Sequence, residues 1–248
     1  MAVEEPLEIR VAGETIAVTM RTPGNDHELV VGFLLAEGII DGTRDLGRVF
    51  HCGRPGDEGY GNVMDVTAAP GASLDVERLG PARRGTLTSS ACGICGRRSI
   101  DDLLAAREPL RVEVRFAARV VEHFASLLGG GQRLFRDTGG THAAALVRAD
   151  GDLLHLREDV GRHNAVDKSV GRMLLDGLDP ESLALVVSGR SSFEIVQKAA
   201  RARIPLVVAV SAPTSLAVDA ARRAGVTLVG FARGEAFNVY TGAERVVF

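Results

Sequence analysis

Residues 183–233 read LALVVSGRSSFEIVQKAARARIPLVVAVSAPTSLAVDAARRAGVTLVGFAR, and short apolar runs alternate in this segment with longer amphipathic stretches. The pattern predicts strands over 183–188, 204–211 and 226–232, with helices over 192–202 and 214–224 between them. Strands that are apolar on both faces and are joined by helices are typical of a largely parallel sheet that helices cover on both sides. We therefore expect an α/β layered architecture for this part of the chain.

The segment just upstream extends this architecture. It predicts a strand over 143–147, a hairpin turn at 149–152, a return strand over 153–156 and a helix from Val160 to about Leu175. A helix over 116–128, ended by the triple glycine 129–131, is expected before the first of these strands. Residues 111–248 are thus expected to form one α/β domain with a mixed, largely parallel sheet.

The N-terminal part of the chain has a different pattern. The elements expected here are a β-hairpin over 7–20, a helix over 26–37, short strands over 47–52 and 62–68, and a helix over 99–107. Asp26 is the expected cap of the first helix and Gly38 its stop. Residues 69–91 are rich in Pro, Gly and Ser and break the pattern. We expect residues 1–110 to form an α+β part that ends with a cysteine-containing loop and the helix after it.

The composition excludes several classes of protein. The 248 residues are 46% hydrophobic and 25% charged, with a net charge of −3, so the chain has no basic excess for binding nucleic acid. No apolar run reaches the roughly 20 residues of a membrane-spanning helix, and residues 1–5 lack the apolar core of a secretory signal. Three cysteines without such a signal are typical of a reducing compartment. We therefore expect a cytoplasmic protein with no nucleic-acid and no membrane partner.

Two of the three cysteines, Cys92 and Cys95, lie in the glycine-flanked segment SSACGICG, residues 89–96. Small and polar neighbours cannot bury the two thiols well, which argues against a purely structural role. Two arginines at 97–98 and a helix expected to begin near Ser99 both favour the thiolate, which is the nucleophilic form of cysteine. The segment therefore predicts a reactive cysteine.

Three chemistries fit this CxxC segment: a zinc site, a redox-active dithiol and a sulfur-relay site. A tetrahedral zinc site needs four ligands, and His51 with Cys52 would have to complete the set, although adjacent ligands chelate one metal awkwardly. A thioredoxin-like dithiol needs a strand that runs directly into the motif, whereas residues 81–90 are expected to form a loop. Sulfur or redox chemistry in a loop fits the segment better than metal binding.

Three connections that follow the expected strands are rich in small and polar residues. They are SGRSS (188–192), SAPTS (211–215) and FARGEA (231–236). The backbone N–H groups of such turns, with Arg190 and Arg233, are expected to bind phosphate groups at one edge of the sheet. Plain capped turns are the alternative, and neither a G-x-G-x-x-G nor a P-loop pattern is present.

Ionisable residues are concentrated in EDVGRHNAVDK (158–168), around the start of an expected helix. His163 and Asp167 are four residues apart, so they could form a hydrogen-bonded pair on one helix face. The alternative is an acidic helix start whose other side chains are solvated. His142, just before a strand, is a candidate ligand or catalytic group, or else a hydrogen-bonded core histidine.

Seven segments together resemble the formate dehydrogenase accessory sulfurtransferase (FdhD) family of sulfur carriers. They are TPGNDHELVVGFLLAEGII (22–40), SSACGICG (89–96), TGGTHAAAL (138–146), EDVGRHNAVDK (158–168), SGRSSFEIVQKAA (188–200), VSAPTSLAVDAA (210–221) and FARGEAFNVYTG (231–242). The resemblance implies a homodimer and a cytidine-deaminase-like, three-layer fold for residues 111–248. Deamination itself is not expected, because the sequence after His142 lacks the glutamate of the H-x-E motif and the CxxC precedes it.

The resemblance also implies a function. Members of the family accept sulfur from a cysteine desulfurase as a persulfide and pass it to the bis-molybdopterin guanine dinucleotide (Mo-bis-MGD) cofactor before its insertion into formate dehydrogenase. By motif, the persulfide position is Cys92 with Cys95 beside it, and no permanent metal is implied. The implied cofactor-binding residues are Phe231, Ala232, Arg233, Gly234, Glu235 and Ala236, and the guanine nucleotide end suits Ser188, Gly189, Arg190 and Ser191. A chaperone that binds the cofactor without carrying sulfur is the alternative function.

Overall fold

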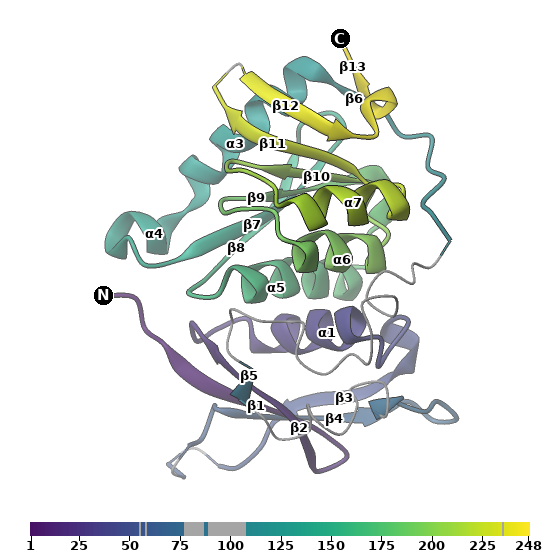
Figure 1. Cartoon of the computed structure of the whole chain (residues 1–248). Coiled ribbons are helices and arrows are strands. Elements are labelled where there is room, and N and C mark those ends of the chain that lie inside the picture. Colours follow the sequence, from purple (N-terminus) through teal and green to yellow (C-terminus); the bar gives the residue numbers. More distant parts are fainter. Residues whose placement is uncertain (55, 58, 77–86, 89–107, 235) are drawn as a thin grey trace.

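The computed structural model describes residues 1–54, 56–57, 59–76, 87–88, 108–234 and 236–248. Over these residues the chain forms two main sheets, and a pair of helices packed against each other lies between them (Figure 1). Cys92, Cys95, the helix expected over 99–107 and Glu235 lie outside the described residues. The domain boundary expected after residue 110 therefore stays a prediction.

The N-terminal sheet has five strands in the order β3-β4-β1-β2-β5. They are β1 (Glu5–Val11), β2 (Glu14–Arg21), β3 (Leu46–His51), β4 (Val63–Ala68) and β5 (Leu87–Thr88). The hairpin and the two short strands expected from the sequence are confirmed. The sequence pattern does not predict β5, because only its parallel pairing with β2, in which Thr88 lies opposite Thr19, makes these two residues a strand.

One face of this sheet is covered by α1 (Asp26–Glu37), which ends where the sequence predicts, at Gly38 with φ 78°. The expectation that Asp26 caps this helix is wrong. The cap position is Asn25, without a side-chain hydrogen bond, and Asp26 lies in the first turn. There its carboxylate accepts a hydrogen bond from Arg21 Nε at 3.0 Å. Arg21 is almost fully buried, so its charge needs this partner more than the helix needs a cap.

The C-terminal sheet has six strands in the order β12-β11-β10-β9-β7-β8. They are β7 (His142–Arg148), β8 (Leu153–Asp159), β9 (Leu183–Val187), β10 (Leu206–Ala209), β11 (Thr227–Arg233) and β12 (Ala236–Thr241). The sheet is mixed, as expected. Its parallel share is smaller than expected, because parallel pairing is confined to β9, β10 and β11, and β7, β8 and β12 run antiparallel to their neighbours.

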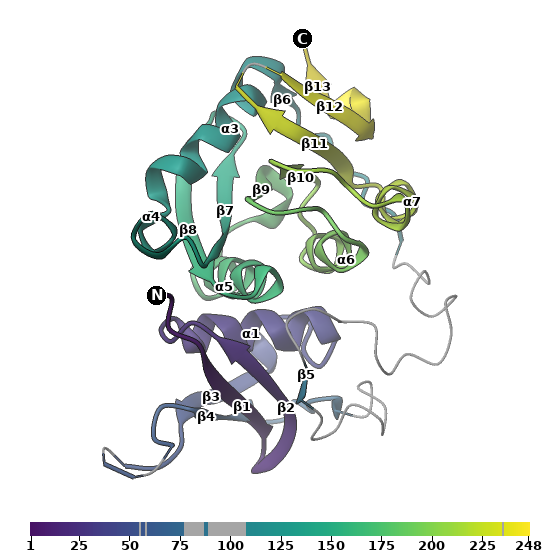
Figure 2. The same cartoon turned by 60° about the vertical axis from the view of Figure 1, so that its left-hand side comes forward.

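Helices cover both faces of this sheet, which confirms the expected three layers (Figures 1 and 2). On one face lie α5 (Arg162–Leu175), α6 (Phe193–Arg201) and α7 (Ser215–Ala224), and on the other lies α3 (Ala118–Gly131). Successive residues of β7 point to opposite faces. Ala144 and Leu146 therefore join the core of α5 and α6, whereas Ala143 and Ala145 join the core of α3.

Several short elements differ from the sequence-based expectation. α3 begins at Ala118 and includes the triple glycine, which is expected from the sequence to end the helix. The elements not anticipated are α4 (Arg133–Thr138), β12 and the two-stranded sheet of β6 (Phe116–Ala117) with β13 (Val246–Val247). Single-turn helices complete the description at η1 (Thr43–Asp45), η3 (Pro180–Ser182) and η4 (Ala243–Arg245). None of the helices among the described residues is long and apolar enough to cross a membrane.

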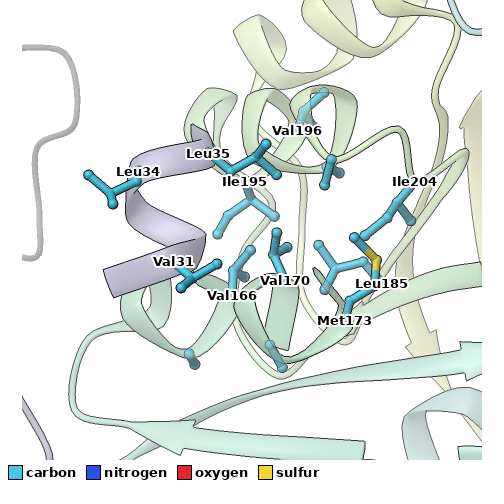
Figure 3. Close-up of a cluster of buried hydrophobic side chains, with 14 of the residues drawn as sticks. Val31, Leu34, Leu35, Val166, Val170, Met173, Leu185, Ile195, Val196 and Ile204 are labelled. Atoms are coloured by element: carbon cyan, nitrogen blue, oxygen red, sulfur yellow. The ribbon is translucent and has the colours of Figure 1, made fainter. Parts of the chain in front are cut away.

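α1 and α5 pack against each other so closely that only glycine fits at the crossing. A Cβ atom built on Gly32 would lie 1.9 Å from the backbone oxygen of Asp167, and one on Gly171 would lie 1.8 Å from that of Glu28. Around this crossing, apolar side chains of α1, α5 and α6 meet in one cluster, in which Val31 lies beside Val166 (Figure 3). The two parts of the chain thus share a continuous core.

Candidate functional site

The carboxyl edge of the central strands brings together the three connections that the sequence singled out. Thr214 N donates to Ser191 O at 3.0 Å, which joins the connection after β9 to the one after β10. Phe231 N donates to Ser211 O at 3.1 Å, and Arg233 Nε donates to Val210 O at the same distance. We call these three linked connections, residues 188–192, 210–215 and 231–234, the carboxyl edge.

The first connection, after β9, is shaped by close contacts. Ser188 Oγ accepts a hydrogen bond from Ala143 N at 2.9 Å and so ties the connection to the start of β7. Arg190 is exposed, whereas Ser191 is completely buried and its Oγ has no hydrogen-bond partner. The sequence predicts that Arg190 and Ser191 both contact a ligand. Of these two residues, only Ser191 has a buried polar atom without a hydrogen-bond partner.

The third connection is a hairpin rather than the turn expected after a strand ending at residue 232. β11 continues to Arg233 and β12 begins at Ala236, with irregular register between Gly230 and Arg233. Phe231 lies in this irregularity with φ 54°, a backbone conformation that is rare for a bulky residue, and its side chain is 44% exposed. Strain of this kind persists where surrounding contacts enforce it and is found often at ligand-binding sites.

His142 belongs to the same edge. It begins β7, and because β7 runs antiparallel to β9, the start of β7 lies at the carboxyl end of β9. A Cβ atom built on Gly189 would lie 3.5 Å from His142 Nδ1 and 3.9 Å from Arg162 Cδ. Burial and the neighbouring Arg162 guanidinium lower the pKa of His142. Its imidazole is therefore held in the neutral form at this edge.

The pKa of His142 predicts how stability depends on pH. The unfolded chain takes up a proton near pH 6.5, about the ordinary value, whereas the folded chain resists protonation. Stability from His142 is thus present above this pH and lost as the pH falls. We expect the free energy of unfolding to decrease between pH 7.5 and pH 5.5, measured by urea denaturation, with a slope from this residue below about 1.4 kcal/mol per pH unit.

His142→Asn should flatten this pH dependence, and His123→Asn, at an exposed position of α3, should leave it unchanged. The flattening is partial because burial also lowers the pKa values of His51 and His155. Identical curves for wild type and His142→Asn would contradict the prediction.

The expected pairing of His163 with Asp167 is wrong. His163 Nε2 lies 2.7 Å from Glu194 Oε2, and Asp167 accepts both of its short contacts, at 2.7 and 2.8 Å, from Lys198 Nζ. The i,i+4 spacing places both α5 residues on one face of the helix. That face packs on α6, where Glu194 and Lys198, also four residues apart, supply the opposite charges. The alternative of solvated side chains is also wrong, since His163 and Asp167 are both buried.

The His163 contacts exclude one familiar arrangement. Ser192 Oγ lies 3.4 Å from His163 Nε2, the same ring nitrogen that Glu194 engages. In a Ser-His-Glu triad the serine and the carboxylate use different ring nitrogens. These residues therefore do not form a serine hydrolase site.

The residues of the zinc alternative are only partly described. Cys52 is a free, half-buried thiol, and the neighbouring His51 Nε2 lies 3.8 Å from Asp26 Oδ2. Within the described part of the chain, no three His, Cys, Asp or Glu side chains are arranged to hold a metal ion. Cys92 and Cys95 lie outside that part, so the zinc alternative is not tested by the structure.

Sequence reasoning missed how the strand before the CxxC segment is joined to the start of α5. β5 ends at Thr88, opposite Thr19 of β2. Asn164, in the first turn of α5, donates from Nδ2 to Met20 O at 2.7 Å. The strand that precedes the CxxC segment is thus paired with a strand that is hydrogen-bonded to the N-terminus of α5. No local pattern could reveal this, because β5 is only two residues long.

Comparison with known proteins agrees with this architecture. A profile of the FdhD/NarQ family matches residues 2–247. The chain belongs to the FdhD/NarQ family. A relative in Anaeromyxobacter dehalogenans (strain 2CP-1), named sulfur carrier protein FdhD, is 55% identical over 253 residues, which cover 99% of this chain and 88% of the relative. A Streptomyces coelicolor protein of the same name is 48% identical over 252 residues, with the same coverage.

A solved structure is also similar. It is a crystal structure from Desulfotalea psychrophila of a protein assigned as a formate dehydrogenase accessory protein, with a TM-score of 0.77 and 25% sequence identity. The match covers 99% of this chain and 90% of that chain. The family resemblance expected from the seven segments is therefore confirmed, and the mixed α/β fold is that of a family member.

Proposed function

We propose that this protein is a sulfur carrier that serves the maturation of formate dehydrogenase. Cys92 accepts sulfur from a cysteine desulfurase as a persulfide, and the carboxyl edge binds the Mo-bis-MGD cofactor, the substrate that receives the sulfur. The relatives named sulfur carrier protein FdhD support the first role. The similar Desulfotalea psychrophila protein, assigned as a formate dehydrogenase accessory protein, supports the link with that enzyme.

The observation that carries the proposal is the connection between β5 and α5. Cys92 follows Thr88 by four residues, and four residues span at most about 14 Å. Thr88 is paired with β2, whose last residues are hydrogen-bonded to Asn164 at the start of α5. The start of α5 adjoins the carboxyl edge, because a Cβ atom built on Gly189 would lie 3.9 Å from Arg162 Cδ. This arrangement supports the proposal that Cys92 meets both the sulfur donor and the cofactor.

The chemistry of loading is a thiol exchange. The Cys92 thiolate attacks the outer sulfur of the desulfurase persulfide, a new sulfur–sulfur bond forms on Cys92, and the desulfurase cysteine leaves as a thiolate. No net oxidation occurs in this step. Attack of the Cys95 thiolate on Cys92 Sγ would then release the outer sulfur as hydrosulfide and leave a disulfide, with the two thiols supplying the two electrons.

Intact-mass spectrometry tests the proposal directly. The full chain is incubated with a cysteine desulfurase and cysteine, and we expect a mass gain of one or two sulfur atoms that dithiothreitol reverses. A chain that gains no sulfur but binds the cofactor would instead be a chaperone without carrier activity.

Arg233 gives a second test, at the carboxyl edge. Its Nε holds Val210 O, so the side chain joins the second and third connections. We expect Arg233→Ala to weaken binding of GDP about 5- to 50-fold in calorimetry, because both the positive charge and this hydrogen bond are lost. Arg222→Ala, which removes an exposed arginine of α7, should leave the dissociation constant unchanged. An unchanged dissociation constant for Arg233→Ala would remove this residue from the site.

A further inference from the structure

A buried carboxylate lies where the end of β2 meets the turn between β8 and α5. Asp159, the last residue of β8, is completely buried, and Lys168 Nζ, 2.7 Å away, balances its charge. Its Oδ2 atom accepts a hydrogen bond from Thr22 N at 3.1 Å, and its Oδ1 atom accepts one from Gly161 N at 2.8 Å. One carboxylate thus holds the end of β2 and the start of the turn together.

Asn164 adds a second set of contacts at the same place. It lies in the first turn of α5 and is buried. Its Nδ2 atom donates to Met20 O at 2.7 Å and to Asp159 Oδ1 at 3.2 Å, so both donors of the amide group are used. Its Oδ1 atom accepts a longer contact, 3.4 Å, from Thr19 Oγ1. A single side chain of α5 therefore contacts both β2 and Asp159.

Thr22 completes the network from the side of β2. Its N–H donates to Asp159, its hydroxyl oxygen accepts from Val160 N at 3.0 Å, and its carbonyl oxygen accepts from Lys168 Nζ at 2.7 Å. Buried polar networks whose members are all hydrogen-bonded hold one geometry. We call this network the β2–α5 junction, and its members are Thr19, Met20, Thr22, Asp159, Val160, Asn164 and Lys168.

The β2–α5 junction lies between the two places that the proposed reaction must bring together. On one side Thr19 is the partner of Thr88 in β5, the strand that precedes the CxxC segment. On the other side the turn of the junction leads into Arg162, whose Cδ atom adjoins the carboxyl edge at Gly189. Other contacts between the two parts of the chain, such as that of Arg157 with Glu28, reach α1 instead of β2.

We infer that Asn164 and Thr22 are positioning residues for sulfur delivery. They hold β2, and through it β5, against the start of α5, and so fix the point at which Cys92 is tethered relative to the carboxyl edge. The inference rests on the proposed function, because that function places the sulfur acceptor on the carboxyl edge.

Loading and delivery depend differently on this junction. Loading needs only the Cys92 thiolate and the desulfurase persulfide. In delivery the sulfur–sulfur bond breaks, Cys92 Sγ keeps its electron pair as a thiolate, and the outer sulfur passes to the acceptor. The acceptor is a reduced metal centre of the cofactor, which supplies the two electrons that convert the sulfur into sulfide. Because the tethered thiol and the acceptor then belong to one complex, the rate depends on their relative placement.

The test measures loading and delivery separately on the full chain. Loading is followed by intact-mass spectrometry after incubation with desulfurase and cysteine. Delivery is followed by formate dehydrogenase activity, per amount of variant protein, in cells that lack the native protein. Asn164→Ala should load sulfur at the wild-type rate and reduce formate dehydrogenase activity about 5- to 30-fold, because β2 is then free to shift against α5.

A pair of variants at Thr22 and one at Ser169 serve as controls. Thr22→Val removes the acceptor of Val160 N with little change in shape and should reduce delivery about 3- to 10-fold, whereas Thr22→Ser keeps the hydroxyl and should deliver normally. Ser169 Oγ, buried in the same helix, donates to Ala144 O of β7 and does not contact β2. Ser169→Ala should therefore lower stability and leave delivery unchanged.

The combined results decide between the possible outcomes. Normal loading with impaired delivery in Asn164→Ala and Thr22→Val, and normal delivery in Ser169→Ala, supports the inference. Wild-type delivery by both Asn164→Ala and Thr22→Val would overturn it and leave the carrier function standing. Equal losses in Ser169→Ala and Asn164→Ala, or a loss of loading that matches the loss of delivery, would also overturn it. Absence of loading on the wild type would refute the proposed function and the inference with it.

Discussion

Cys92→Ala is expected to reduce persulfide formation to background and to abolish the support that the protein gives to formate dehydrogenase activity. The reason is chemical: an alanine methyl group cannot attack a persulfide or hold a sulfur atom. Folding and GDP binding should persist, because the binding edge belongs to the other part of the chain. The measurements are intact-mass spectrometry after incubation with desulfurase and cysteine, and formate dehydrogenase activity in cells that lack the native protein.

Two further cysteine variants sharpen this result. Cys52→Ala removes the half-buried thiol of the N-terminal sheet and should load sulfur normally. Cys95→Ala should still load sulfur on Cys92 if Cys95 acts only in release, and the persulfide should then persist longer. Full maturation of formate dehydrogenase with Cys92→Ala would refute the carrier assignment. Loss of a stoichiometric metal ion from the variant would favour the zinc alternative.

Lys168→Met is expected to destabilise the protein by about 3–5 kcal/mol, the cost of removing one member of a buried ion pair. Lys168 Nζ lies 2.7 Å from Asp159 Oδ2 and donates to Thr22 O at the same distance. Asp159 is completely buried, so the variant leaves its carboxylate without a cation. Thr22 follows β2 of the N-terminal sheet, and Asp159 ends β8 of the C-terminal sheet. Lys168 contacts both residues and so joins the two sheets. The measurement is the free energy of unfolding from urea denaturation.

The matched control is Arg172→Met in the same helix. Arg172 is only partly buried and pairs with Asp176 at i,i+4. Its second partner, Glu28, lies 3.6 Å away and keeps Arg157 as a partner in the variant. The loss of Arg172 should therefore cost less than about 1 kcal/mol. The double variant Asp159→Asn/Lys168→Met removes both charges, so it should be more stable than Lys168→Met alone. Equal stability of Lys168→Met and wild type would show that the pair contributes nothing at this junction.

The elements that hydrophobic pattern predicts well are those whose partners lie nearby in sequence. The strands β9, β10 and β11 are apolar on both faces, and each connection to the next is a single helix, so periodicity is sufficient to predict them. The α1 helix is predictable for a different reason: the turn before Asp26 and the Gly38 stop mark its ends, whereas its residues are buried on nearly all sides and carry no clear periodicity. β5, β6 and β13 are not, because two residues carry no periodicity and become strands only through pairing with distant segments.

Side-chain partners are less predictable than elements. His163 and Asp167 have the spacing of a helical pair, yet each contacts α6, because the packing of two helices offers better-placed opposite charges. Arg190 and Arg162 are both arginines beside the same turn, and sequence reasoning selects the exposed one. Burial distinguishes them, and burial is a property of the assembled molecule.

The sequence alone determined the layered α/β class and the family, because local periodicity and short motifs carry that information, and it predicts a reactive CxxC segment. Only the tertiary structure decided which charges are paired, which buried polar atoms lack a partner, and how the strand before the CxxC segment is joined to the start of α5. These depend on contacts between residues far apart in the sequence, such as Met20 and Asn164, which are 144 positions apart. Such contacts form through packing and desolvation, and a linear pattern does not record either of them.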